Sequence, residues 1–233
     1  MATPRLFLSP VVKEAICQNL NFEDIVNLRD AFKLSSLKCP VTIFDPNSSK
    51  EITLPGVNPT TITIAELVGD YGLNLALIKA AKKGWNLVVQ TLINAGTNVN
   101  EVNQYGETAL ILASARGRYF VVQTLIRAGA DVEAASNHGS TALIWASLNG
   151  HNSTVQTLIA AGANVNAVDR NKQTALMMAS KNGHHSVIQT LIAAKANVNA
   201  VNQFGDTAST LASGKGYSQI VKYLKNMGHI NFQ

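Results

Sequence analysis

Cysteine, charge and long apolar runs are all scarce in this chain. Of its 233 residues, two are Cys and 14% are charged. Cys17 and Cys39 are too few for the disulfide framework of a small secreted domain, so we expect reduced thiols in the cytoplasm. No apolar run reaches the roughly 18 residues that a membrane-spanning helix needs. Residues 1–12 lack a clean hydrophobic segment, and we expect no secretory signal peptide.

The excess of basic residues belongs to one part of the chain. The net charge is +5, but residues 1–68 carry six Lys or Arg against seven Asp or Glu, whereas residues 69–233 carry thirteen against seven. The apolar content of 46% is typical of a globular protein. Because no nucleic-acid-binding motif is present and few aromatics accompany the basic residues, we do not expect a nucleic-acid partner.

A repeat of 33 residues fills the C-terminal two-thirds of the chain. Thr108, Thr141, Thr174 and Thr207 keep this spacing, and each is followed directly by Ala. The same step relates two further sets, Gly84, Gly117, Gly150, Gly183 and Gly216, and Leu92, Leu125, Leu158, Leu191 and Leu224. A strict period of this length predicts stacked supersecondary units. Such stacks offer a long binding surface and seldom carry chemistry.

One repeat, residues 103–135, predicts a pair of helices and an extended arm. Thr108 is a candidate N-cap for a helix over 109–115, and Gly117 suits the left-handed position that follows a helix. A second helix is expected over 119–128, where apolar residues recur at helical spacing. Residues 130–134 then read as a short extended arm. Neither helix can bury its apolar face until the next pair stacks on it.

This pattern resembles the ankyrin repeat. The resemblance rests on matches such as Gly106, Thr108, Leu110, Ala113, Gly117, Leu125, Gly129, Ala130 and Asp131. It implies an all-α solenoid with short β-arms and five units, about 70–102, 103–135, 136–168, 169–201 and 202–233. The family's Thr-Pro-Leu-His opening is altered here, because Ala replaces Pro and the His position holds Ile111, Ile144, Met177 or Thr210.

Repeat four departs from the others at two glycine positions. Lys195 stands where the other units have Gly96, Gly129, Gly162 and Gly228, and Lys172 replaces the glycine found at Gly106, Gly139 and Gly205. A positive φ at Lys195 would cost about 1–2 kcal/mol. We therefore expect repeat four to be the least stable part of the stack.

Residues 1–37 form a small helical N-terminal region with apolar residues at helical spacing. This segment resembles an F-box, which docks a substrate receptor onto the adaptor subunit of a cullin–RING ubiquitin ligase. The residues in register are Leu8, Val12, Ile16, Leu20, Ile25 and Leu28, together with Cys17, Asp24 and Phe32. The F-box opening Leu-Pro is Leu8-Ser9 here, with Pro10 one place late. The alternative interpretation is an amphipathic cap on the first repeat.

Residues 38–69 read as a linker followed by a capping helix. Pro, Ser and Asn recur in the segment, as is typical of a loop. Short strands are expected at 41–44 and 51–54. Thr63 and Glu66 form a candidate capping box for a helix ending near Tyr71. The ankyrin-repeat domain would then occupy 70–233.

The positions of Cys and His in the sequence give little support for a catalytic or metal site. A Cys–His pair would need Cys17 or Cys39 beside one of the histidines. His151 and His184 share one repeat position, which we interpret as a helix start. Equivalent positions on neighbouring helices lie about 8–10 Å apart, too far to share a zinc ion. We expect no enzyme activity, no cofactor and no metal.

The inner helices and arm tips are the expected binding groove. The candidate residues are Lys79, Lys82, Lys83, Tyr105, Leu112, Arg116, His138, Trp145, Leu148, Arg170, Met178, Lys181, Phe204 and Lys215. We expect Trp145 to be an exposed anchor between Leu112 and Met178; the alternative is that Trp145 is partly buried and the lysines are only solvated.

These features predict a monomeric protein–protein interaction module for a partner with an acidic, partly apolar surface. With the F-box-like segment, the chain would be a substrate receptor for a cullin–RING ubiquitin ligase. It also resembles the host-directed ankyrin effectors of intracellular bacteria, which would place it in the host cytoplasm. The alternative is a plain ankyrin scaffold or inhibitor with no ligase link.

Overall fold

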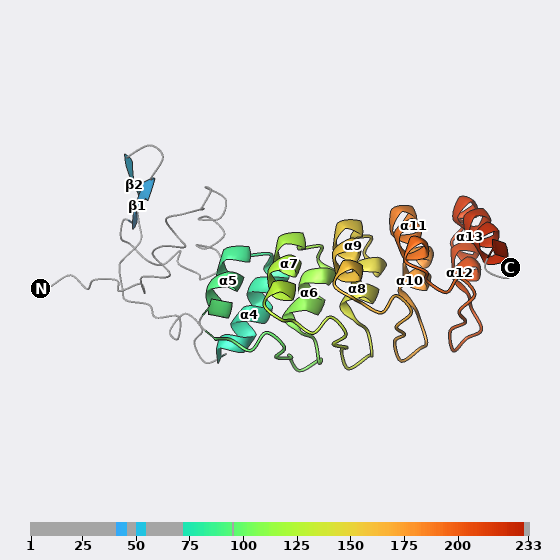
Figure 1. The fold of residues 1–233 in the computed structure, drawn as a ribbon, viewed down its shortest axis with the longest axis horizontal. Coiled ribbons are helices and arrows are strands. Elements are labelled where there is room, and N and C mark those ends of the chain that lie inside the picture. Colours follow the sequence, from blue (N-terminus) through green and yellow to red (C-terminus); the bar gives the residue numbers. More distant parts are fainter. Residues whose placement is uncertain (1–40, 46–49, 55–71, 95, 231–233) are drawn as a thin grey trace, which may run out of the picture.

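Ten helices stacked as five pairs make up most of the computed structural model, which describes residues 41–45, 50–54, 72–94 and 96–230. The first helices of the pairs are α4 Gly72–Lys83, α6 Ala109–Ala115, α8 Ala142–Leu148, α10 Ala175–Lys181 and α12 Ala208–Gly214. The second helices are α5 Asn86–Asn94, α7 Tyr119–Arg127, α9 Asn152–Ala160, α11 His185–Ala193 and α13 Ser218–Ile230. Figure 1 shows the pairs in a row, with the connecting arms on one side.

Local hydrogen bonds explain where the first helices begin and end. The hydroxyl oxygen of Thr108 accepts from the Ile111 amide at 3.2 Å, and Thr174 caps α10 in the same way. After α6 the backbone turns at Gly117, whose φ is +63°. The Thr-Ala register therefore sets the start of each helix, and the glycine lets the chain reverse into the second helix. The predicted helices 109–115 and 119–128 are confirmed within one residue.

Between repeats the core is a continuous apolar row. Leu92, Leu125, Leu158, Leu191 and Leu224 are all buried, as are Ala113, Ala146, Ala179 and Ala212 of the first helices. Ile111, Ile144 and Met177 occupy the position of the family's histidine and are also buried. Apolar side chains therefore fill this position in three units. In the last unit the exposed Thr210 forms a capping box with Thr207 instead.

Gly228 does not play the role of the other glycines in its register. It lies inside α13 and has no positive φ, whereas Gly96, Gly129 and Gly162 do. A Cβ at this position would approach Oδ1 of Asn199, in the preceding arm, to 3.2 Å. The last helix therefore continues through Gly228, and the missing side chain lets the helix lie against that arm. Grouping Gly228 with the helix-ending glycines was wrong for this reason.

Two short strands form a hairpin, β1 Val41–Asp45 and β2 Lys50–Leu54, which pair antiparallel with Val41 opposite Leu54. The strands predicted at 41–44 and 51–54 are thus confirmed. Short β-bridges also close the arms, as between Val102 and Thr108 and between Val168 and Thr174. The F-box-like residues Leu8 to Phe32, both cysteines and the predicted helix at 63–71 lie outside the described residues.

Candidate protein-binding surfaces

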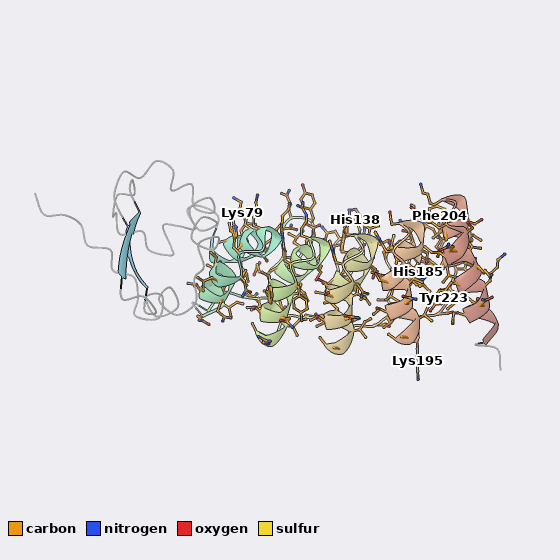
Figure 2. All side chains as sticks on the ribbon, turned by 90° about the horizontal axis from the view of Figure 1, so that it is seen from above. Lys79, His138, His185, Lys195, Phe204 and Tyr223 are labelled. Carbon is orange, nitrogen blue, oxygen red and sulfur yellow. The ribbon has the colours of Figure 1, made fainter. Side chains whose placement is uncertain are left out.

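Six of the basic residues predicted for the groove are exposed on the first helices or at their ends. They are Lys79, Lys82, Lys83, Arg116, Lys181 and Lys215. In Figure 2, Lys79 lies along the same long edge of the stack as the arm residues His138 and Phe204, whereas Lys195 points away at the opposite edge. The inner helices and the arm tips therefore contribute side chains to one continuous side of the molecule.

Trp145 is half-buried and not the exposed anchor that the sequence suggested. Its indole Nε1 is fully buried and has no acceptor among the described residues. Leu112, Leu148 and Met178 are half-buried as well, and three of these four residues pack against the core. The Trp145 ring therefore lies partly against the hydrophobic core of the stack. The apolar strip formed by Leu112, Trp145, Leu148 and Met178 is consequently only partly exposed.

The arm tips present the most exposed aromatic side chains on this side. Tyr105 is 56% exposed and Phe204 68% exposed, and the predicted arm residues His138 and Arg170 are exposed too. Backbone hydrogen bonds hold successive arms in register: the Arg170 amide donates to the His138 carbonyl at 3.0 Å. Because the arms are tied to one another, their aromatic tips are presented on a rigid edge.

Charge is separated between helices and arms. The helices and their capping residues carry ten basic residues and no acidic one: Lys79, Lys82, Lys83, Arg116, Arg118, Arg127, Lys181, Lys215, Lys222 and Lys225. All the acidic residues between 72 and 228 lie in the arms, namely Glu101, Glu107, Asp131, Glu133, Asp169 and Asp206. Every Lys, Arg, Asp or Glu on these helices and their capping residues is therefore basic.

The arm carboxylates act as local hydrogen-bond acceptors. Oδ1 of Asp169 accepts from the amides of Asn171 and Gln173, each at 2.8 Å, and so shapes the turn at the tip. Oε1 of Glu133 accepts from the Asn164 amide of the next repeat at 2.8 Å. These two acids therefore help to fix the backbone conformation of the arms.

His151 and His184 join adjacent repeats, a role that the sequence did not predict. Nε2 of His184 lies 2.9 Å from the carbonyl oxygen of Leu148 at the end of α8. Each ring packs against the glycine that ends the preceding unit's first helix, Gly117 for His151 and Gly150 for His184. Burial lowers the pKa of His151 below its ordinary 6.5; His184 and Arg118 lower it further, against a hydrogen bond to the Ala115 backbone.

The described part of the chain contains no group of three or more His, Cys, Asp or Glu placed to hold a metal ion. Within the same residues, no helix has the length and apolar character needed to cross a membrane. The interpretation of His151 and His184 as simple helix-start residues is incomplete. Both residues do precede α9 and α11, but their side chains also contact the repeat before.

Comparison with known families agrees with the geometry. The family model for ankyrin repeats, described as three copies, matches residues 77–169 and 143–233, which together span more than half of the chain. No curated protein matches the sequence. Capped helix pairs, left-handed glycines, stacked arms and the family match lead to one conclusion. The chain belongs to the ankyrin-repeat family.

Proposed function

We propose that the ankyrin stack binds a protein partner through the inner helices and arm tips, and that the partner offers an acidic, partly apolar surface. Ankyrin repeats generally mediate protein–protein interactions and are typically not enzymes. The observation that carries the proposal is the charge separation: Lys82, Arg116 and Lys181 are exposed on helices that carry no acid. An acidic surface would meet no like charge there.

Binding of the partner would combine electrostatic attraction by the lysines with contacts to apolar side chains. Lysines on an exposed face attract acidic partners over a distance of about 8–10 Å at moderate salt, which raises the association rate. Tyr105 and Phe204 at the arm tips supply the apolar contacts that retain the partner. Half-buried Trp145 would add the edge of its ring. We therefore expect affinity to fall as salt rises, mainly through slower association.

Charge reversal tests this surface. Lys82→Glu combined with Lys181→Glu should abolish capture of the partner from a eukaryotic lysate, because both side chains lie on the inner helices. Lys222→Glu combined with Lys225→Glu is the matched control, since it makes the same charge change on exposed residues of α13. Proteins retained by wild type and control but lost from the inner-helix variant would support the proposal. Equal capture by both variants would place the site elsewhere.

The finer part of the proposal concerns residues 6–33. Their apolar spacing supports a second role as a ligase-adaptor docking segment, which would make the chain a substrate receptor and, if it acts inside a host cell, an effector. Titrating purified adaptor subunit against wild type and against Leu8→Ala with Ile16→Ala tests this. Binding that the double variant loses supports the receptor. No binding to wild type at tens of micromolar favours the alternative, a plain scaffold or inhibitor.

A further inference from the structure

One exposed position recurs at the end of the first helix in every repeat. It is the residue directly before the glycine that follows the helix, and it is exposed in all five units: Lys83, Arg116, Asn149, Asn182 and Lys215. The first helices pack on one another in order along the stack. These side chains therefore form one row along the inner helices, which we call the inner row.

Basic charge along the inner helices is interrupted at the third repeat. The position one residue before the inner row holds Lys82, Ala115, Leu148, Lys181 and Gly214. At these two positions the other four repeats each carry at least one exposed basic side chain, whereas the third repeat carries Leu148 and Asn149. In the described part of the chain, none of the five first helices carries an acidic residue. The inner helices thus present two basic clusters, an N-terminal cluster of Lys82, Lys83 and Arg116 and a C-terminal cluster of Lys181 and Lys215.

The two asparagines of the inner row bond within their own helices. Nδ2 of Asn149 donates to the Trp145 carbonyl at 3.0 Å, and Nδ2 of Asn182 donates to the Met178 carbonyl at 2.8 Å. Their amides extend the last turn of α8 and α10 and add no charge. In the fourth repeat Lys181 supplies a cation beside the amide, but in the third repeat no cation stands at either position.

The apolar strip runs beside the inner row. Leu112, Trp145 and Met178 each stand four residues before a member of the row, which places both on the same side of the helix. All three are half-buried and pack against the core. At the third repeat the strip is widest, because Leu148 is half-buried there as well. The uncharged gap between the two clusters is therefore an apolar one.

The spacing of the repeats sets the length of anything that reaches both clusters. Neighbouring packed helices lie about 8–10 Å apart, so the gap between Arg116 and Lys181, two repeats apart, is about 16–20 Å. The whole row from Lys83 to Lys215, four repeats apart, is about 32–40 Å long. Since a chain extends by at most about 3.3–3.6 Å per residue, a segment needs at least about nine residues to cover the row.

We infer that the inner row takes one elongated segment of the partner, in which two acidic clusters flank an apolar centre. This inference rests on the proposed function and adds the arrangement of the charges. One acidic cluster pairs with the N-terminal cluster and the other with the C-terminal cluster, while the centre lies over Trp145 and Leu148. A carboxylate over the third repeat would lose water without gaining a cation. Nucleic acid fits less well, because its backbone carries a charge at every step and would place phosphates there too.

Two peptides of identical composition test the arrangement. The bipartite peptide is acetylated and amidated Glu-Glu-Ser-Ser-Leu-Phe-Leu-Ser-Ser-Glu-Glu, and its isomer, Leu-Ser-Ser-Glu-Glu-Phe-Glu-Glu-Ser-Ser-Leu, carries all its acids near the centre. The full chain, labelled with nitrogen-15, is titrated with each. We expect the bipartite peptide to bind about three- to tenfold more tightly, because it alone reaches both basic clusters at once. It should shift the amide signals of both Arg116 and Lys215.

Variants of the inner row test whether the uncharged gap sets this preference. Asn149→Lys places a cation in the gap, at a position where Arg116 and Lys215 show that a long basic side chain fits. It should tighten binding of the isomer about threefold and change binding of the bipartite peptide little. Lys215→Glu cancels the charge of the C-terminal cluster and should remove the preference for the bipartite peptide. Lys225→Glu makes the same charge change on α13 and, as the matched control, should keep it.

The outcomes separate this inference from the proposed function. Equal binding of both peptides to wild type would overturn the arrangement and leave an acidic partner in place. Binding of neither peptide would also overturn it, and the capture experiment with the inner-helix variant would then decide the proposed function by itself. Tighter binding of a single-stranded oligodeoxynucleotide of the same net charge than of the bipartite peptide would overturn it in favour of a polyanion. If Asn149→Lys does not fold, Lys215→Glu against Lys225→Glu still gives the test.

Discussion

Nε2 of His184 lies 2.9 Å from the carbonyl oxygen of Leu148, so the histidine of one repeat closes the last turn of the first helix of the repeat before it. A carbonyl only accepts, so this nitrogen carries the proton and donates. The other side of the ring lies against Gly150, where a Cβ would come within 2.6 Å of Nδ1. The inter-repeat bond therefore requires both the histidine and the absence of a side chain on the glycine.

Substituting this glycine should destabilise the stack by two separable effects. Gly150→Ala introduces a Cβ at a residue whose φ is +75°, and this Cβ would also clash with the His184 ring. Gly162→Ala introduces a Cβ at a φ of +92°, but no atom lies within 4 Å of it. The positive φ should lower the free energy of unfolding by about 1–2 kcal/mol in both variants. The clash with the ring should lower it by about 1–3 kcal/mol more in Gly150→Ala. Urea unfolding of the two variants measures the difference. Equal losses would show that the ring moves aside freely.

Stability should fall on the acid side of pH 6.5 through His151. Its pKa is lowered in the folded protein, chiefly by burial. The unfolded chain therefore binds more protons than the folded chain as pH drops below 6.5, and the free energy of unfolding decreases through the folded pKa. Above 6.5 this contribution is fully present. Urea midpoints measured on both sides of this pH should differ less in His151→Gln, and an unchanged difference would assign the effect to other groups.

Lys195→Gly should stabilise the protein by about 1–2 kcal/mol, because φ at Lys195 is +65° and glycine adopts this conformation without strain. Lys195→Ala keeps the Cβ and serves as the control, for which we expect little gain. The thermal midpoint reports both. A midpoint that stays level or falls in the glycine variant would contradict the prediction that repeat four is strained.

Ser147→Ala should leave the stability unchanged or raise it by about 1 kcal/mol. The Ser147 hydroxyl is fully buried and has no partner among the described residues, and a buried unpaired hydroxyl is costly. The first repeat already carries buried Ala81 at this position. Thr141→Ala is the contrasting variant, since it removes the cap of α8 and should cost about 1 kcal/mol. A clear loss in Ser147→Ala would indicate that the hydroxyl has a partner.

The sequence alone determined what happens within a repeat. Thr108 caps its helix through an amide three residues away, and Gly117 turns the chain directly after the helix. Such features depend on residues that are close in the sequence. The 33-residue repeat shows the same residues at the same positions in several units, which makes the features easier to predict. For the same reason, the strained backbone at Lys195 could be foreseen from the glycines at its register position.

Only the tertiary structure decided how one repeat meets the next. The half-burial of Trp145 and the bond from His184 to Leu148 both depend on how the units stack. Thr124 reaches Asn86 across 38 residues, while Thr157, at the same position one repeat later, bonds within its own helix. A repeat pattern predicts equivalent junctions. Which side chains meet at a junction depends on stacking, and that pairing is a property of the packed solenoid.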